Sequence, residues 1–416
     1  MRHWHLSRAS LSSRPLAAGF YGPYFLLCTA DSLLTPVLPI YAAQLGADYA
    51  GIGAAVGAST IGMMVGNIPG SVMIRRLGSR RTLQVSILIS VGLLLVALLV
   101  QSIEALVALR FVMGTVMASS NISEHTYLSA AVDPQHRGKM IALFGGVMRG
   151  GFLVGPVVGG LLALRGGAGA TFTAAALLYA IAFVIICVFL PDVDEKVKGV
   201  PGTQRWQRVI HEHGHTLLTA GIAQYLAQMV RAGRPLLIPL YAATVLNLDV
   251  ATIGAVLSIG ALFDLAMFTP AGYVMDRFGR KWAIMPSFGI HALGLALIPF
   301  TQNVWGLSLV ALIVGFGNGL GSGTMMVLAT DLAPTDLRSE FISLWRLLGD
   351  FGSSTAPLIA GAIANALTLN PAIWVIGASG GLAVLMFGLY VPETRPQEPP
   401  WDEKSKRVAE TPQAAP

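Results

Sequence analysis

Twelve apolar stretches, each long enough to cross a lipid bilayer, take up most of this chain. A helix spans the hydrocarbon core with about 20 predominantly apolar residues. Only 12% of the 416 residues are charged, against about 25% in soluble proteins. The sequence therefore predicts an all-α membrane protein with twelve transmembrane helices. They lie near residues 16–45, 51–74, 83–101, 105–130, 139–163, 171–190, 215–245, 252–275, 282–301, 304–330, 339–366 and 371–391.

The basic residues between these stretches fall on one side of the predicted membrane. If both termini are cytoplasmic, the outer loops carry only Arg165, and such an asymmetry of Lys and Arg sets the orientation of membrane proteins. The formal net charge of +6 therefore reflects topology, and no nucleic-acid partner is expected. We expect a multi-pass protein of the cell (plasma) membrane, with an uncleaved first helix, a cytoplasmic linker at 191–214 and a disordered cytoplasmic tail at 392–416.

The two halves of the chain are imperfect copies of each other. A shift of 201 residues places Pro156 on Pro357 and aligns glycines along both halves, and the first helix of each half needs a shift of 200. The repeat predicts two six-helix bundles, at 1–190 and 215–391. A parallel repeat of this kind favours alternating access, in which two halves rock about a site near the bilayer midplane. The alternative is a duplicated scaffold that transports nothing.

Nine charged side chains lie well inside the predicted helices. Each costs about 2.5–3.5 kcal/mol at the bilayer centre on insertion scales, so each is expected to face protein or a water-filled cavity. The third, sixth, ninth and twelfth stretches lack such charges, with His291 as the one exception, and are expected to face lipid around a polar centre. The nine are Asp31, Arg110, Glu124, Arg149, Arg231, Arg234, Asp264, Arg346 and Asp350.

Polar residues form matching stripes on the first and seventh helices, where the repeat places Asp31 on Arg231. These two are candidate partners across a central cavity. One interpretation is a fixed structural pair; the other is a switch in which Asp31 takes up a proton in one state and releases it in the other. The substrate-cavity candidates are Tyr24, Cys28, Asp31, Thr35, Gln224, Gln228, Arg231 and Arg234.

The remaining buried charges differ in how they can be neutralised. Arg346 and Asp350 are four residues apart and could pair on one helix. Asp264 and Arg149 have no local opposite charge, so each needs a partner from another helix or a titrating role. Glu124 lies about 21 Å along the helix axis from the fourth-helix arginine and cannot pair with it directly. The proton-coupling candidates are Asp31, Arg110, Glu124, Arg149, Asp264 and Asp350.

A basic turn follows the second helix of each half. In the second half it reads Gly-Tyr-Val-Met-Asp-Arg-Phe-Gly-Arg-Lys at 272–281. We expect Gly272 to permit close helix packing, Asp276 to lie at the N-terminus of a neighbouring helix, and the cations to anchor the cytoplasmic surface. The residues assigned to the two turns are Gly78, Arg80, Arg81, Gly272, Asp276, Arg277, Gly279 and Arg280.

Two helix motifs accompany these turns: Arg-Phe-Val-Met-Gly at 110–114 in the fourth helix and Gly-Phe-Leu-Val-Gly-Pro-Val-Val-Gly-Gly at 151–160 in the fifth. Glycines four residues apart form a groove for another helix, and the proline removes a backbone donor and can bend the segment. Ordinary small-residue packing is the alternative reading. The fifth-helix motif comprises Gly151, Gly155, Pro156, Gly159 and Gly160.

Together these motifs resemble those of the major facilitator superfamily. The resemblance implies a twelve-helix fold whose first, fourth, seventh and tenth helices line the cavity, with Arg110 taking part in proton coupling. The first-half turn departs from the family pattern because Ser71 and Arg75 replace the usual Gly and Asp. The fifth-helix motif resembles that of drug:proton antiporters, which implies proton-coupled export of small amphipathic or hydrophobic compounds by multidrug-type efflux.

We predict no enzymatic activity, because no nucleophile with a matching base follows from the spacing. The glycines of 315–323 lie in an apolar stretch and are interpreted as helix packing, and the histidines of 211–215 are not predicted to bind metal. The expected partners are a small-molecule substrate, protons and the lipid bilayer, with a proton gradient in place of a cofactor and a functional monomer. The alternatives are a proton-coupled importer of sugars or other small metabolites and a non-transporting receptor or assembly protein.

Overall fold

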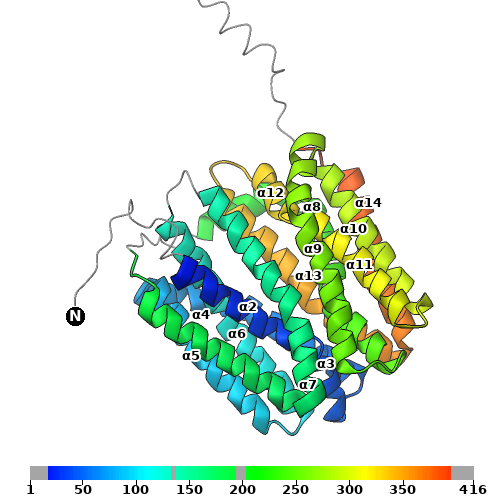
Figure 1. The fold of residues 1–416 in the computed structure, drawn as a ribbon. Helices are drawn as coiled ribbons and strands as arrows, with labels where there is room; N and C mark the ends of the chain where they lie inside the picture. Colours follow the sequence, from blue (N-terminus) through cyan, green and yellow to red (C-terminus); the bar gives the residue numbers. More distant parts are fainter. Residues whose placement is uncertain (1–16, 133–136, 194–202, 395–416) are drawn as a thin grey trace, which may run out of the picture.

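The computed structural model describes residues 17–132, 137–193 and 203–394, which form helices and no strands. Ten helical stretches of this part are long and apolar enough to cross a membrane. One of them, α7 (Arg137–Phe189), contains two spans, because Gly167 adopts φ 67° and the chain folds back there (Figure 1). The more polar α8 (Thr203–Thr244) completes twelve spans. The predicted all-α, twelve-helix fold is confirmed.

Two of the predicted spans are interrupted. The first consists of η2 (Ala17–Tyr21), α2 (Gly22–Leu33) and α3 (Leu38–Gln44). The tenth consists of α11 (Val304–Leu320) and α12 (Thr324–Leu332), separated at Gly321–Gly323. The interpretation of this glycine run as helix packing is therefore wrong at Gly323, where an added Cβ would meet nothing within 4 Å. Gly323 instead adopts φ 75°, a left-handed conformation that glycine accepts without strain.

Several of the remaining spans begin at capped N-termini that recur between the halves. Asp48 and Asp249 accept hydrogen bonds from backbone amides of the helices that they precede, and so do Ser102 and Asn303. Such caps satisfy amides that have no partner within the helix. The spans are α4 (Tyr49–Leu77), α5 (Ser79–Val96) with η3 (Ala97–Leu99), α6 (Ile103–Ala131), α9 (Val250–Phe278), α10 (Arg280–Leu297) with η4 (Ile298–Phe300), α13 (Arg338–Ala366) and α14 (Leu369–Tyr390).

The helix that contains the seventh predicted span begins before that span. Helix α8 starts at Thr203, so part of the predicted linker at 191–214 is helical. Arg205 forms an ion pair with the buried Glu340 and donates a hydrogen bond of 2.6 Å to the Asp336 carbonyl. These contacts stabilise the polar start of the helix against α13. Because this start is charged, it does not belong to an apolar stretch, and the sequence did not indicate that the helix extends over it. Residues 194–202 and the tail from 395 onward lie outside the described residues.

The two halves meet along helices α4 with α13 and α7 with α9. We call the end of the molecule where residues 17 and 394 lie the terminal end, and the opposite end the far end (Figure 1). Toward the far end, Gly53 packs against the Pro357 carbonyl and Gly254 against the Pro156 carbonyl, so closely that neither position has room for a Cβ. The repeat relates these two contacts. Backbone contact between the halves is therefore close toward the far end.

Candidate functional site

A buried carboxylate cluster occupies the first half. The Tyr179 hydroxyl donates a hydrogen bond of 2.6 Å to Asp31, which also interacts electrostatically with Arg110 and Glu124. Arg110 donates a hydrogen bond of 2.9 Å to the Ser59 hydroxyl. Glu124 is 4% exposed and makes no ion pair with any described residue. This carboxylate cluster, Asp31 with Glu124, therefore holds two buried acids that form no ion pair with any described residue.

Aromatic packing surrounds this cluster on the side of the terminal end. Tyr24 stacks on Phe144 with ring centroids 3.9 Å apart, and His125 contacts the same ring edge-on at 5.0 Å. Cys28 lies directly against Gly151 of α7. Two of the predicted cavity residues, Tyr24 and Cys28, are therefore packed inside the first half.

An ion pair joins the two halves at the centre. The Arg149 Nε atom of α7 lies 3.4 Å from Asp264 Oδ1 of α9, and the side chains are only 12% and 9% exposed. The other carboxylate oxygen of Asp264 accepts a hydrogen bond of 2.8 Å from Asn318, and Arg149 also donates to the Ser322 hydroxyl at 2.7 Å. Arg149 and Asp264 were expected to need a partner from another helix or a titrating role, and in this structure each is the partner of the other.

The seventh helix places two further arginines beside this ion pair. Arg231 donates one hydrogen bond of 2.9 Å to the Gly321 carbonyl, where α11 ends, and its guanidinium carbon lies 4.8 Å from the centre of the Phe288 ring. Its Nε atom is buried without a hydrogen-bond partner. Arg234 forms no hydrogen bond or ion pair with any residue in the described ranges. Both therefore have guanidinium groups with free bonding capacity.

A cavity of about 230 Å³ lies between the halves next to these charges. Arg149, Arg234, Asp264, Ser32 and Thr35 supply its polar lining, and the rest of its wall is apolar. The lining residues come from the first, fifth, seventh, eighth and tenth spans. The fourth span, which the family resemblance placed at the cavity, contributes none of them. Of the predicted cavity residues, the structure brings Thr35 and Arg234 to this wall.

Several predicted pairings are not formed. Asp31 and Arg231 make their contacts within separate halves, so the proposed pair between them is wrong for this structure. Arg346 and Asp350 interact electrostatically, but no ion pair joins them in the described chain. Gln224 and Gln228 lie against Gly349 of α13, because that glycine leaves room for them, and neither lines the cavity.

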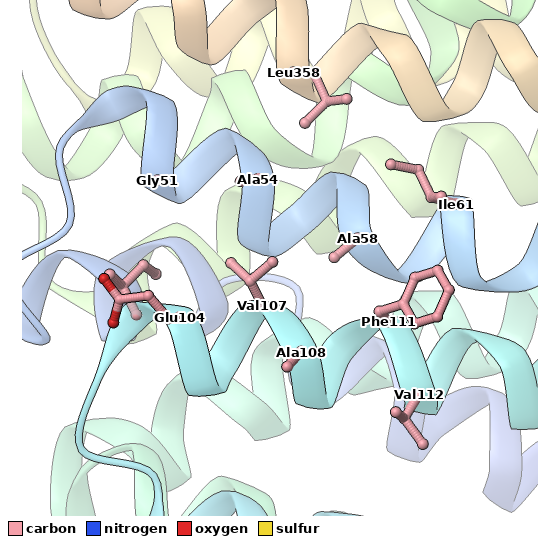
Figure 2. Close-up of a pocket in the computed structure, with 11 residues that line it drawn as sticks. Gly51, Ala54, Ala58, Ile61, Glu104, Val107, Ala108, Phe111, Val112 and Leu358 are labelled. Atoms are coloured by element: carbon pink, nitrogen blue, oxygen red, sulfur yellow. The ribbon is translucent and has the colours of Figure 1, made fainter.

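A larger apolar groove lies outside this site. It encloses about 700 Å³ between α4, α6 and Leu358 of α13, and Figure 2 shows Glu104 at one end of an otherwise apolar lining. Phe111 and Val112 in its wall are 37% and 43% exposed, so the groove is open at the surface of the protein. It has no convergent polar groups, so it is not the candidate site.

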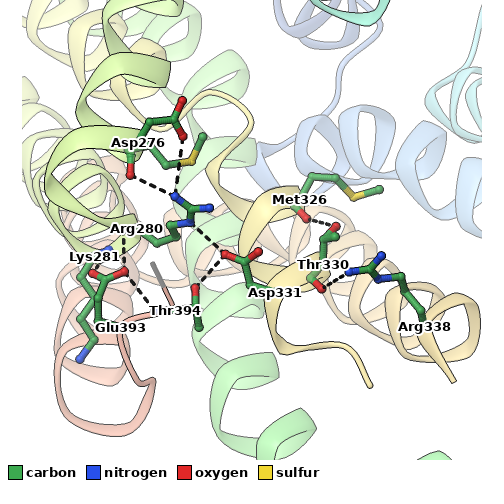
Figure 3. Close-up of polar contacts among 10 residues, drawn as sticks. Asp276, Arg280, Lys281, Met326, Thr330, Asp331, Arg338, Glu393 and Thr394 are labelled. Atoms are coloured by element: carbon green, nitrogen blue, oxygen red, sulfur yellow. Dashed lines mark hydrogen bonds and ion pairs between the residues drawn. The ribbon is translucent and has the colours of Figure 1, made fainter. Parts of the chain in front are cut away.

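The second-half basic turn is held by acids from three segments. Arg280 lies 2.9 Å from Asp331 and 3.7 Å from the exposed Asp276 (Figure 3). Glu393 accepts hydrogen bonds from the backbone amides of Arg280 and Lys281 at 2.8 and 3.0 Å. The predicted place of Asp276 at a helix N-terminus is therefore wrong, because Glu393 fills it. A Cβ on Gly272 would meet nothing within 4 Å, so its predicted packing role is also wrong.

The first-half turn keeps only part of this arrangement. Arg80 pairs with Asp192 at 3.1 Å and donates to the Cys187 carbonyl at 3.1 Å. In the second half the repeat places Lys281 at the position of Arg80 and Glu393 at the position of Asp192. The Lys281 ammonium likewise donates a hydrogen bond of 2.9 Å to the Gly388 carbonyl, which corresponds to that of Cys187. Ser79 occupies the position that corresponds to Arg280, so the first half has no counterpart of the ion pairs that join Arg280 to Asp331 and Asp276. Of the other turn residues, Gly78 and Gly279 adopt φ 82° and 114°, Arg81 is exposed, and Arg277 stacks on Tyr273 and Phe278.

The glycines of the fifth-helix motif form the groove that their spacing predicted. Added Cβ atoms on Gly151 and Gly155 would lie 2.9 Å from the Thr29 nitrogen and 2.8 Å from the Thr29 oxygen, and Gly159 lies as close to Leu33. Gly160 faces the other half, with Ala251 Cα 2.9 Å from the position of a Cβ. The motif therefore holds α2 on one side and seals against α9 on the other.

Sequence reasoning missed several residues of the site. Tyr179 lies on a helix expected to face lipid, yet it is buried, at 6% exposed. His291, the titratable exception that the sequence already showed on these helices, is buried too, at 1% exposed. A tyrosine in mid-helix does carry a signal, because a buried hydroxyl needs a partner. Asn318 and Ser322 carried no comparable signal, since their role depends on the break in the tenth span.

Comparisons with known proteins agree with this architecture. The family model of the Major Facilitator Superfamily matches residues 23–229 and 220–413. The chain is 26% identical to the tetracycline resistance protein, class C, of Escherichia coli over 65% of its length and 69% of that protein. It is 24% identical to the quinolone resistance protein NorA of Staphylococcus aureus over 88% of its length and 94% of that protein. The solved structure of the nucleoside transporter NupG superposes with a TM-score of 0.72 at 15% identity, covering 88% of this chain and 97% of NupG.

Proposed function

Since the chain belongs to the major facilitator superfamily and is therefore a multi-span membrane transporter, we propose that it is a proton-driven antiporter that exports small amphipathic compounds. Its resemblance to the drug-efflux branch supports this direction, because relatives named for tetracycline and quinolone resistance align over most of its length. We also propose that it acts as a monomer in the plasma membrane. The distribution of Lys and Arg supports an orientation with both termini in the cytoplasm.

The observation that carries the proposal is the carboxylate cluster. Asp31 is held by a hydroxyl donor, Tyr179, and not by an ion pair, and Glu124 lies buried beside it. An intramembrane acid of this kind marks a proton path in transporters. The cluster lies in one half, and the cavity lies between the halves, so rocking of the halves would change the exposure of both together.

The close far-end contacts at Gly53 and Gly254 fit one state of an alternating-access cycle, the state that is closed at the far end. With the terminal end cytoplasmic, these contacts close the protein toward the outside. Proton release from Asp31 and substrate capture from the cytoplasmic side would then occur in this state, and the outward-open state would form by separation of α4 from α13 and of α7 from α9.

The test is proton movement in liposomes that contain the purified protein and a trapped pH reporter. A panel containing tetracycline, a quinolone and naphthoate is added, and at least one compound is expected to drive proton movement. Asp31→Asn should abolish this movement, while Glu104→Gln, a matched carboxyl-to-amide change outside the site, should retain it. Retained coupling in Asp31→Asn would remove Asp31 from the mechanism.

The importer of sugars or other small metabolites is the second reading, and the fold similarity to a nucleoside transporter is compatible with it. The same liposomes distinguish the two, because a symporter moves its substrate and protons in the same direction. No proton movement with any compound, from protein shown to be folded, would favour the non-transporting alternative.

A further inference from the structure

The buried charges at the centre of the molecule do not balance. Arg149, Arg231 and Arg234 interact electrostatically with one another, and Asp264 is the single carboxylate among the described residues that interacts with both Arg231 and Arg234. Three guanidinium groups face one carboxylate, which leaves an excess of two positive charges. Each unneutralised charge at this depth is costly, so a stable protein needs a counter-charge or water there.

Asp264 carries a single negative charge, which the ion pair with Arg149 already engages, and it makes no hydrogen bond or ion pair with either extra arginine among the described residues. One of its oxygens accepts from Arg149 and the other from Asn318. The neighbouring His291 interacts electrostatically with Arg231 and Arg234, but it cannot supply negative charge, and both its ring nitrogens are buried without a hydrogen-bond partner. The missing negative charge is therefore not provided by this group of residues.

The acids of the first half do not neutralise these arginines either. Asp31 accepts a hydrogen bond from the Tyr179 hydroxyl and interacts electrostatically with Arg110 of its own half. Glu124 interacts electrostatically with Asp31. None of the ion pairs in the described ranges joins Asp31 or Glu124 to Arg231 or Arg234. The proton-carrying acids and the surplus arginines are thus separate groups.

The cavity brings one surplus arginine to a largely apolar wall. Arg234 and the Thr35 hydroxyl lie on its lining, and neither donates a hydrogen bond to any residue that the structure describes. Phe152, Leu257 and Ile238 contribute apolar surface to the same cavity. A guanidinium group presents paired N–H donors that match the two oxygens of a carboxylate.

We propose that the cavity takes an amphipathic organic anion, whose carboxylate or similar head group binds Arg234 and whose apolar body lies against Phe152, Leu257 and Ile238. The bound anion supplies the charge that the arginines lack. An amphipathic cation, the opposite class, would place like charge beside Arg234 and be disfavoured. The cavity volume of about 230 Å³ favours a small body such as one or two aromatic rings. This inference rests on the proposed function and names the substrate class of the same site.

The test compares three compounds of one shape and different charge: naphthoate, the neutral naphthamide and the cationic naphthylmethylammonium. Their binding to the purified full chain in detergent is measured by equilibrium dialysis. Naphthoate is expected to bind about tenfold or more tightly than naphthamide, because a charged hydrogen-bond pair is worth about 1.5–3 kcal/mol. The unmodified protein suffices for this comparison, so it does not depend on any variant folding.

Variants then identify the arginine. Arg234→Gln should reduce naphthoate affinity about tenfold or more and leave naphthamide binding unchanged, and Arg234→Lys should give an intermediate loss. Arg346→Gln, which removes a membrane-spanning arginine outside the cluster, should bind naphthoate as the unmodified chain does. Equal affinity for naphthoate and naphthamide, or unchanged naphthoate affinity in Arg234→Gln, would overturn the proposal.

The outcome also separates this inference from the proposed exchange. Proton movement driven by naphthylmethylammonium in liposomes, without binding of naphthoate, would overturn the anion site and leave the antiporter in place. Naphthoate that binds through Arg234 but drives no proton movement would support the anion site and contradict proton exchange.

Discussion

Enlarging Gly254 is expected to open the far end of the protein. A Cβ at this position would lie 2.9 Å from the carbonyl carbon of Pro156, and still closer to its oxygen. Atoms in contact prefer about 3.5–4.0 Å, and the oxygen would lie only 2.1 Å from the Cβ, so α7 and α9 would have to separate by roughly 1 Å or more. Overpacking of this kind costs about 1–3 kcal/mol. Because the contact belongs to the closed far end, Gly254→Ala should shift the equilibrium toward the opened far end by about 5- to 150-fold.

The shift can be measured as a distance between spin labels. Gln101 and Gln302 are exposed at equivalent positions on the two halves at the far end, and labels there report the separation of the halves. Cys28 and Cys187 are free and would first be replaced. Gly381→Ala is the matched control, since its added Cβ meets nothing within 4 Å. A distance distribution in Gly254→Ala identical to that of the control would refute the reasoning.

Three further predictions concern stability. Asp264→Asn leaves a buried arginine unpaired and should lower the free energy of unfolding by about 3–5 kcal/mol, measured by denaturation in detergent; no loss would contradict the ion pair between the halves. Asp249→Ala should cost about 0.5–2 kcal/mol and more than Asp48→Ala, because Asp249 accepts two backbone amides and Asp48 one. Hydrogen bonds with Thr252 lower the Asp249 pKa, so this stabilisation is full above the ordinary aspartate pKa and disappears as the pH falls through the lowered value. Glu393→Gln should speed amide exchange at the start of α10, whereas Asp276→Asn, which removes an exposed carboxylate, should change it little; equal effects would restore Asp276 as the cap.

The fold followed from the sequence because each span needs a long apolar stretch, and such stretches are visible without tertiary information. The predicted helix boundaries were wrong where the apolar stretch does not coincide with the helix. The start of α8 at Thr203 is charged and depends on the contact with Glu340, which lies far away in the chain. The break at Gly321–Gly323 was hidden because glycines serve both close packing and left-handed turns.

The site was only partly predictable. Arg149 and Asp264 could be recognised as lacking local partners, but their meeting depends on how the halves pack. The expected contact between Asp31 and Arg231 failed because the repeat makes two positions equivalent without bringing them together. Each instead makes its contacts in its own half, to Tyr179 and to Gly321. The excess of positive charge at the centre could be recognised only from the structure, because the sequence indicates which charged residues are buried but not which of them lie close together.

The most direct test of proton-driven export is uphill transport under a pH gradient alone. Liposomes with the protein in one orientation are loaded with equal concentrations of labelled naphthoate inside and outside, and protons are made more concentrated on the side opposite the terminal end. The account predicts net movement of naphthoate away from the terminal side against its own rising gradient, abolished by Asp31→Asn and by collapse of the pH gradient. Movement toward the terminal side would indicate symport, and the absence of any net movement while naphthoate still exchanges across the membrane would contradict proton coupling.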